Sequence, residues 1–175
     1  YIHFLRMVAL VLDKPFQQAV QQCAEPFLAV EEGNEKGKLF QRKGLESIKG
    51  FVRMHNKMKS KDDHFHKPKP RPSFNVDINR CLATVKGPDE MVGLLDALQA
   101  KFGAFAKWKN EMAYDYETAK ELCHLRKMMV SVVYKHQNDD GTPVTFSELA
   151  QDPRVQEMWA GTDFKEVSLR ASRVV

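Results

Sequence analysis

Apolar residues recur at helical spacing along most of the chain. Residues 2–12 are apolar on nearly every face and rich in Leu, Met and Ala, which favours a buried helix. Asp13 occupies an N-cap position and Pro15 the first turn after it, so we predict a second helix that ends at Pro26. A third helix is predicted over residues 39–58, although two glycines weaken it by about 1 kcal/mol each.

The second half of the chain carries clearer start and stop signals. Asp77 caps a short predicted helix that Gly87 closes, and residues 88–102 form the next helix, with Pro at its first position. Residues 104–136 contain neither Pro nor Gly and keep helical spacing. They predict one long helix, or two helices broken near residues 114–116.

Capping signals predict three short helices near the C-terminus. Thr145 and Glu148 have the spacing of a capping box, and residues 152–153 and 162–163 each start a further helix. No run of residues alternates convincingly between apolar and polar. We therefore predict an all-α fold, an irregular bundle of about seven or eight helices.

Three prolines interrupt the helical pattern between residues 60 and 75. Pro68, Pro70 and Pro72 each remove a backbone donor and bias the preceding residue towards extended geometry. We therefore predict a stiff, basic, polyproline-like connector over residues 60–75.

The connector divides the chain into two helical parts. The N-terminal part covers residues 1–59 and the C-terminal part residues 76–175, either as separate lobes or as one continuous domain with a long crossover. Trp108 and Trp159 lie on apolar helical stripes, so we predict that both are largely buried.

The composition is that of one ordinary domain of 175 residues, with 43% hydrophobic residues and a net charge of +4. This apolar content excludes disorder across the whole chain, and no apolar run approaches the roughly 20 residues that a membrane span requires. Three cysteines far apart in sequence, Cys23, Cys81 and Cys123, indicate an intracellular setting, cytoplasmic or nuclear. The N-terminus shows neither an initiator Met nor a signal peptide, so we expect a fragment of a longer protein.

Basic side chains concentrate between Lys36 and Arg71. That basic segment holds twelve basic and three acidic residues, a net +9, whereas the rest of the chain sums to −5. Such a concentration attracts nucleic acid or acidic proteins, and a solvated surface is its default interpretation. On the third predicted helix the basic residues recur at steps of seven, four and four, and so line one face. The candidate binding residues are Arg42, Lys49, Arg53, Lys57, Lys67, Lys69 and Arg71.

Two features of this segment bear on the kind of partner. The alternating prolines of residues 68–72 resemble a ligand for an SH3-type groove, because a preformed polyproline helix lowers the ordering entropy and Arg71 supplies orientation. Aromatic residues for stacking single-stranded nucleic acid are few, namely Phe40, Phe51 and Phe65.

Residues 138–149 resemble the acidic loop of an EF-hand. The register is displaced, because counting Gly141 as loop position 6 puts His136 at position 1 and Glu148 one place beyond position 12. A cation that needs six or more oxygen ligands does not tolerate both losses. We therefore predict no calcium site.

Other chemical motifs are missing or poorly spaced. The two histidines of residues 62–66 share a metal ion only in extended geometry, and exposed connector positions are the simpler interpretation. Cys123 and His124 are adjacent on a predicted helix and point about 100° apart, so they do not form a nucleophile and base. No phosphate-binding or nucleophile motif occurs. We predict no catalytic, cofactor-binding or metal-binding residues.

Residues 76–82, Val-Asp-Ile-Asn-Arg-Cys-Leu, resemble a stretch in the helical integrase-binding domain of lens epithelium-derived growth factor. That module docks unstructured peptides of chromatin proteins, so the resemblance implies a helix with a docking role. It covers seven of the 175 residues, and Gly87-Pro88 breaks the helix that the family continues. No functional residue is carried over from it.

These observations predict a non-enzymatic, all-helical interaction or scaffold domain of a larger intracellular protein. A protein partner would bind in a helix groove or on the basic connector face. The alternative is a nucleic-acid-binding domain that uses residues 36–71, and the third class is an enzyme without a recognisable motif. Salt dependence separates the first two, because affinity for a polyanion falls steeply with salt whereas a groove binder ignores the polyanion.

Overall fold

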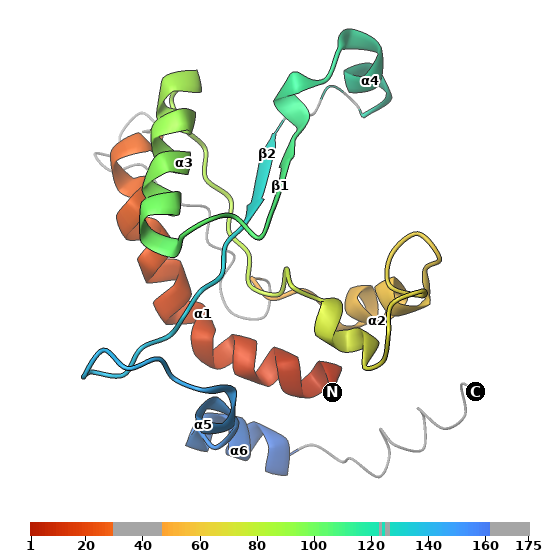
Figure 1. The fold of residues 1–175 in the computed structure, drawn as a ribbon, viewed down its shortest axis with the longest axis vertical. Helices are drawn as coiled ribbons and strands as arrows, with labels where there is room; N and C mark the ends of the chain where they lie inside the picture. Colours follow the sequence, from red (N-terminus) through yellow and green to blue (C-terminus); the bar gives the residue numbers. More distant parts are fainter. Residues whose placement is uncertain (30–46, 123, 125–126, 162–175) are drawn as a thin grey trace. The chain divides into compact units, whose positions relative to one another are not determined.

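The computed structural model describes residues 1–29, 47–122, 124 and 127–161 (Figure 1). The chain forms two compact units, and the first helix contributes residues to both of them. Unit 1 comprises the described residues of Tyr1–Pro15, Arg42–Arg80 and His136–Val175. Unit 2 comprises those of Phe16–Gln41 and Cys81–Lys135.

Unit 1 is built from short helices around a small apolar core. Its helices are the first part of α1 (Ile2–Ala24), α2 (Phe51–Lys59), η3 (Arg71–Phe74), α5 (Phe146–Ala150) and α6 (Pro153–Ala160). The buried core cluster consists of Met7, Val8, Val11 and Val155. Phe4 lies edge-on to Phe146 and to Trp159, with ring centroids 5.4 and 5.5 Å apart, so aromatic contacts hold α5 and α6 against α1.

Unit 2 combines helices with a small antiparallel sheet. Its elements are the rest of α1, η1 (Glu25–Phe27), α3 (Pro88–Phe102), β1 (Lys107–Asn110), η4 (Glu111–Ala113), α4 (Tyr116–Glu121) and β2 (Met128–Ser131). The buried core cluster consists of Phe16, Val20, Ala24, Leu28, Leu94 and Leu98. In the sheet Trp108 stands opposite Val130, and Val130 packs against this core.

The predicted all-α bundle of seven or eight helices is wrong. Among the described residues there are six α-helices and a two-stranded sheet, which occupies part of the helix predicted over 104–136. Gly103 ends α3 with a φ of 81°. Val130, Val132 and Tyr134 then alternate into the core of unit 2. This period of two, carried by β-branched and aromatic residues, favours extended structure over a helix.

The two helices predicted over residues 2–26 are in fact one helix, α1, with Pro15 inside it. Asp13 does not cap a helix, because its carboxylate accepts hydrogen bonds from Ser47 Oγ at 2.8 Å and from Asn79 Nδ2 at 3.2 Å. These partners are distant in sequence, so the local pattern could not reveal them. Although α1 has 23 residues, no helix in the described part of the chain is long and apolar enough to cross a membrane.

Two further helix predictions differ from the structure. In the described part of the third predicted helix, α2 begins only at Phe51, and Ile48 before it forms an isolated β-bridge with Asn79. The short helix predicted after Asp77 is therefore absent, and residues 76–82 do not form the helix that their resemblance implied. The Asp77 carboxylate binds other side chains of unit 1 and does not cap a helix.

Three locally signalled helices are confirmed. α3 covers residues 88–102 as predicted. Thr145 and Glu148 form the reciprocal capping box of α5, and the Asp152 side chain caps α6. The helix predicted to start at 162–163 lies outside the described residues.

The burial predicted for the two tryptophans is wrong. Trp108 is 58% exposed and Trp159 is 36% exposed. Trp108 lies on β1 and not on the apolar stripe of a helix, whereas Trp159 lies on α6 and contacts Phe4 edge to face.

Candidate functional site

The described part of the basic segment forms α2 and the loop that returns along it. Gly50 is the N-cap of α2, and Lys57 and Lys59 lie in its last turn, where cations interact favourably with the helix C-terminus. Ser60 ends the helix, and its backbone N–H donates back to the last turn. Residues 50–71 hold seven basic and two acidic residues, which give this helix and loop a net charge of +5.

Backbone hydrogen bonds fix the start of this loop against α2. The amides of Asp63 and Phe65 donate to Ser60 O at 3.2 and 3.1 Å. The amide of His64 donates to Lys57 O at 3.0 Å. The side chains of the loop therefore take defined positions beside the last turn of α2.

The predicted polyproline-like connector is not an extended rod. Residues 61–65 form turns, and the 3-10 helix η3 covers Arg71–Phe74. Pro72 lies inside that helix, and Ser73 Oγ donates to Pro70 O at 2.7 Å. An SH3-type groove recognises a continuous polyproline helix, so this conformation argues against that interpretation.

Aromatic rings in this part of unit 1 are already engaged by side chains of the same chain. Lys67 Nζ lies 5.7 Å from the ring centroid of Phe74, and the guanidinium carbon of Arg71 lies 5.1 Å from that of Phe65. Phe51 stacks on two histidines at centroid distances of 4.4 and 5.9 Å. These cation–π and stacking contacts occupy ring faces that a nucleic-acid base would need.

Seven cationic side chains lie on α2 and on the loop that follows it, and together they make up the candidate binding region. Five of them are exposed, and Lys57 and Arg71 are half-buried. Within the described residues only Lys57 of this set has an ion pair, so the other charges contribute an unbalanced positive potential. We name this set the basic helix–loop surface, and it consists of Arg53, Lys57, Lys59, Lys61, Lys67, Lys69 and Arg71.

The set just named leaves out two of the predicted binding residues, Arg42 and Lys49. Arg42 lies outside the described residues. Lys49 was expected on an exposed helix face, but it is only 2% exposed, and its Nζ donates to Asp77 Oδ1 at 2.5 Å. Asp77 Oδ2 also accepts from Arg80 Nη2 at 2.7 Å. Lys49 is therefore an interior residue of unit 1, which corrects the sequence prediction.

Burial and charge act in opposite directions on the pKa values of Lys49 and Asp77. Burial lowers the pKa of Lys49, although the hydrogen bond and charge of Asp77 partly oppose it. Burial also raises the pKa of Asp77, but the hydrogen bond from Lys49 and the charges of Lys49 and Arg80 outweigh that effect. The pKa of Asp77 is consequently held below its ordinary value, and its carboxylate stays ionised.

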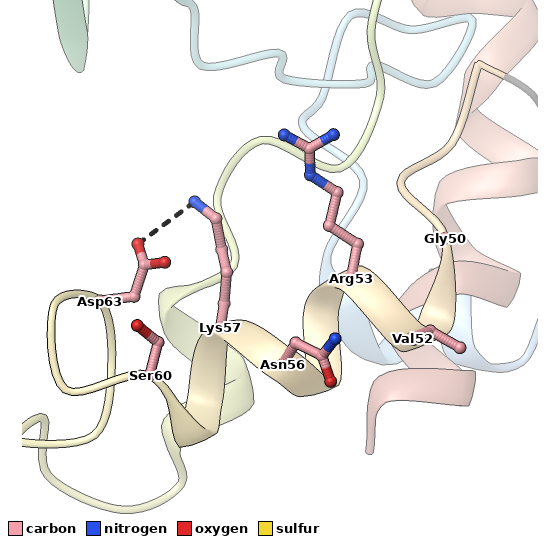
Figure 2. Close-up of a pocket in the computed structure, with 7 residues that line it drawn as sticks. All are labelled: Gly50, Val52, Arg53, Asn56, Lys57, Ser60 and Asp63. Carbon is pink, nitrogen blue, oxygen red and sulfur yellow. Dashed lines mark ion pairs between the residues drawn. The ribbon is translucent and has the colours of Figure 1, made fainter.

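A shallow hollow of about 620 Å³ lies along α2 (Figure 2). Arg53 and Lys57 project from the same side of the helix, and Lys57 Nζ lies 3.5 Å from Asp63 Oδ1. The hollow is thus bordered by two cations and one carboxylate. Its lining residues are Gly50, Val52, Arg53, Asn56, Lys57, Ser60 and Asp63.

His64 is a neutral neighbour of this charged cluster. Burial is the main cause that lowers its pKa, and the positive charge of Lys57 acts in the same direction. Its Nδ1 is buried and has no hydrogen-bond partner within the described residues. A lowered pKa keeps the ring uncharged at neutral pH, so His64 adds no positive charge to the surface there.

The loop that resembles an EF-hand uses its oxygens internally. Asp140 Oδ1 accepts hydrogen bonds from Thr142 N at 2.9 Å and Thr142 Oγ1 at 2.6 Å, and these bonds lower the pKa of Asp140. Glu148 accepts from Thr145 in the capping box, which lowers the pKa of Glu148 in the same way. In the ranges that the structure describes, no group of three or more His, Cys, Asp or Glu side chains is placed to hold a metal ion.

The cysteines give no site that can be described. Cys23 is half-buried and Cys81 is exposed. Cys123, adjacent to His124, lies outside the described residues. The prediction that Cys123 and His124 do not form a nucleophile and base therefore stays a prediction.

Comparison with protein-family models, with curated proteins and with solved structures found no match to this chain.

Sequence reasoning missed three parts of this site. Lys59 and Lys61 are exposed members of the surface, but they fall outside the helical spacing by which the face was chosen. The sequence suggests Asp63 only as an opposing charge and as part of the metal motif of residues 62–66, whereas the structure places it beside Lys57. Asp63 lies six residues after Lys57, just past the end of the helix, and this position is the only signal that the sequence offers. The turn after α2 brings the two side chains together, and the sequence pattern does not predict that turn.

Proposed function

We propose that this chain is a non-catalytic interaction module that binds an acidic segment of a protein partner through the basic helix–loop surface. The single observation that carries the proposal is the run of exposed, unbalanced cations on α2 and its loop, with a net charge of +5 over residues 50–71. A surface of this kind attracts carboxylate-rich chains and fixes their orientation by charge complementarity.

The occupied aromatic rings favour an acidic peptide over single-stranded nucleic acid. Base stacking needs accessible ring faces, and the rings of Phe51, Phe65 and Phe74 already contact histidine, arginine or lysine side chains. A peptide carboxylate needs no ring face, because it binds the guanidinium and ammonium groups directly.

Charge reversal on α2 and its loop tests this proposal. We expect Arg53, Lys59 and Lys61 together changed to Glu to weaken binding of fluorescein-labelled decaglutamate at least about tenfold, because several attractive charges become repulsive. The measurement is fluorescence anisotropy at about 50 mM salt. These three side chains are exposed and make no ion pair with a described residue, so the fold should persist.

The matched control changes the same number of charges in unit 2. Lys86, Lys107 and Lys120 are exposed, and reversing all three to Glu alters the net charge equally. We expect this variant to keep decaglutamate affinity within about twofold of the wild type, because these three lysines are not members of the basic helix–loop surface. An equal loss in both triple variants, or no loss in either, would contradict the proposed surface.

Double-stranded nucleic acid is the second candidate, because the same cations can contact phosphates without using aromatic rings. For a duplex of about 20 base pairs, log affinity should fall linearly with log salt, with a slope near −0.9 for each phosphate neutralised. Tighter binding of this duplex than of decaglutamate at about 200 mM salt would favour this candidate over the first.

A further inference from the structure

The two cations that line the hollow on α2, Arg53 and Lys57, differ in whether they form an ion pair within the described residues. Lys57 faces the Asp63 carboxylate at 3.5 Å, whereas Arg53 has no ion pair within the described part of the chain (Figure 2). The two cations are four residues apart on one helix, so a single anionic group can contact both. Arg53 is therefore available to an incoming anion, whereas Lys57 is already paired with Asp63 of the same chain.

The loop backbone places Asp63 at this position. The Asp63 amide donates to Ser60 O, and the next amide donates to Lys57 O, at 3.2 and 3.0 Å. These bonds bring the Asp63 carboxylate within reach of Lys57. Asp62, its exposed neighbour, makes no ion pair with a described residue.

The ion pair between Lys57 and Asp63 is exposed enough for another carboxylate to replace Asp63. Their side chains are 28% and 39% exposed, whereas the Lys49 side chain of the interior pair is completely buried. A solvent-exposed ion pair contributes little net free energy, so another carboxylate displaces Asp63 from Lys57 at small cost. Exchange at Lys49 would instead leave a buried charge without its partner.

We infer that Asp63 is an internal competitor for the acidic partner of this surface. In the free protein it occupies Lys57, and in the complex an Asp or Glu carboxylate of the partner replaces it and binds Arg53 and Lys57 together. The inference rests on the proposed function, because it specifies the group that the same surface takes. Arg53, Lys57 and Asp63 carry a net +1, which balances a carboxylate. The planar fork of an arginine also suits bidentate carboxylate binding.

Neutralising Asp63 tests the inference, with Asp62 as the matched control. We expect Asp63→Asn to bind fluorescein-labelled decaglutamate about two- to fivefold more tightly than the wild type, because the competing carboxylate is removed. Asp62→Asn makes the same change in net charge without freeing Lys57, so we expect a gain below about 1.5-fold. Equal gains would show that only total charge matters, and an unchanged or weakened Asp63→Asn would show that Asp63 does not compete. Either result overturns the inference.

A double-mutant cycle and a second peptide complete the test. In a Lys57→Gln background the gain from Asp63→Asn should disappear, because no cation is left to be freed, and a gain that persists overturns the inference. If Asp63→Asn binds a phosphoserine peptide more tightly than the wild type does, but binds decaglutamate no more tightly, the ligand class is phosphate and not carboxylate, which overturns the inference. If neither the wild type nor any variant binds decaglutamate, the proposed function fails. If the wild type binds but the two Asp variants behave alike, only this inference fails.

Discussion

Lys49 and Lys57 lie eight positions apart and have opposite environments. Lys49 is buried with its ammonium on Asp77, whereas Lys57 is half-exposed and shares a longer contact with Asp63. Lys49 is therefore part of the interior of unit 1, whereas Lys57 is part of its surface. The difference in burial decides which ion pair stabilises the fold and which is free to exchange with a ligand.

Removing Lys49 should destabilise the protein far more than removing Lys57. We expect Lys49→Ala to lower the free energy of unfolding by about 2–3 kcal/mol, because it leaves a cavity and removes one of the two cations that hold the partly buried Asp77 carboxylate. Lys57→Ala should change it by less than about 1 kcal/mol, since its pair is exposed. Urea unfolding of the two variants provides the measurement, and equal losses would contradict the assignment of the interior and surface lysines.

Asp77 should give unit 1 a stability that is lost in acid. Its pKa is held below the ordinary value of 3.8, so its contribution is fully present above that pH and is lost as the pH falls through the folded-state pKa. Unfolding of the wild type between about pH 5 and pH 2 should therefore show a steeper loss of stability than unfolding of Asp77→Asn. If the loss of stability with falling pH is equally steep in the two proteins, Lys49 and Arg80 do not lower the pKa of Asp77 in the folded state.

At the scale of the elements, close packing overrides helix propensity at one position of α3. Gly93 lies in the interior of α3, where Ala would ordinarily favour the helix by about 1 kcal/mol. A Cβ there would lie 2.5 Å from Cε1 of Phe27, whose ring packs against the core of unit 2. The glycine therefore permits α3 to approach η1.

Gly93→Ala should for this reason destabilise the protein. The methyl group must displace the Phe27 ring, and we expect a loss of about 1–3 kcal/mol in the free energy of unfolding. Gly161→Ala is the control, because a Cβ at Gly161 meets only ordinary contacts, of which the nearest is at 3.6 Å. Thermal unfolding of both variants measures the difference, and a stabilised Gly93→Ala would disprove the close contact.

At the scale of the whole molecule, α1 is the element that takes part in both units. Its first part supplies Met7, Val8 and Val11 to the core of unit 1, and its later part supplies Phe16 and Val20 to the core of unit 2. Burial of both halves explains how the helix continues through a residue that usually ends one, because the apolar area buried on either side outweighs one missing hydrogen bond.

Replacing Pro15 should therefore stabilise the whole chain. Pro15→Ala restores a backbone donor inside α1, and we expect the free energy of unfolding to rise by about 1–3 kcal/mol. Pro153→Ala serves as the control, since Pro153 occupies the first position of α6, where proline costs nothing, and its change should stay below about 0.5 kcal/mol. Chemical denaturation followed by circular dichroism distinguishes them, and a destabilised Pro15→Ala would show that α1 requires the proline.

The sequence by itself determined the features that local chemistry decides. Pro88 and Gly103 bound α3, and the capping box at Thr145 starts α5, because caps and breakers act within a few residues. The concentration of charge in residues 50–71 is likewise a property of the sequence and persists as exposed cations in the structure.

Only the tertiary structure decided the rest, because the deciding partners are distant in sequence or are set by turn geometry. Met128–Ser131 forms a strand because its backbone pairs with β1, and alternate residues from Val130 to Tyr134 pack against the core of unit 2, which outweighs the helical spacing. Lys49 is buried and not on the predicted surface, and its ammonium group is paired with Asp77, which lies 28 positions away in the sequence. Asp63 reached Lys57 because the turn after α2 folds back, and no pattern of residue types fixes how a loop returns.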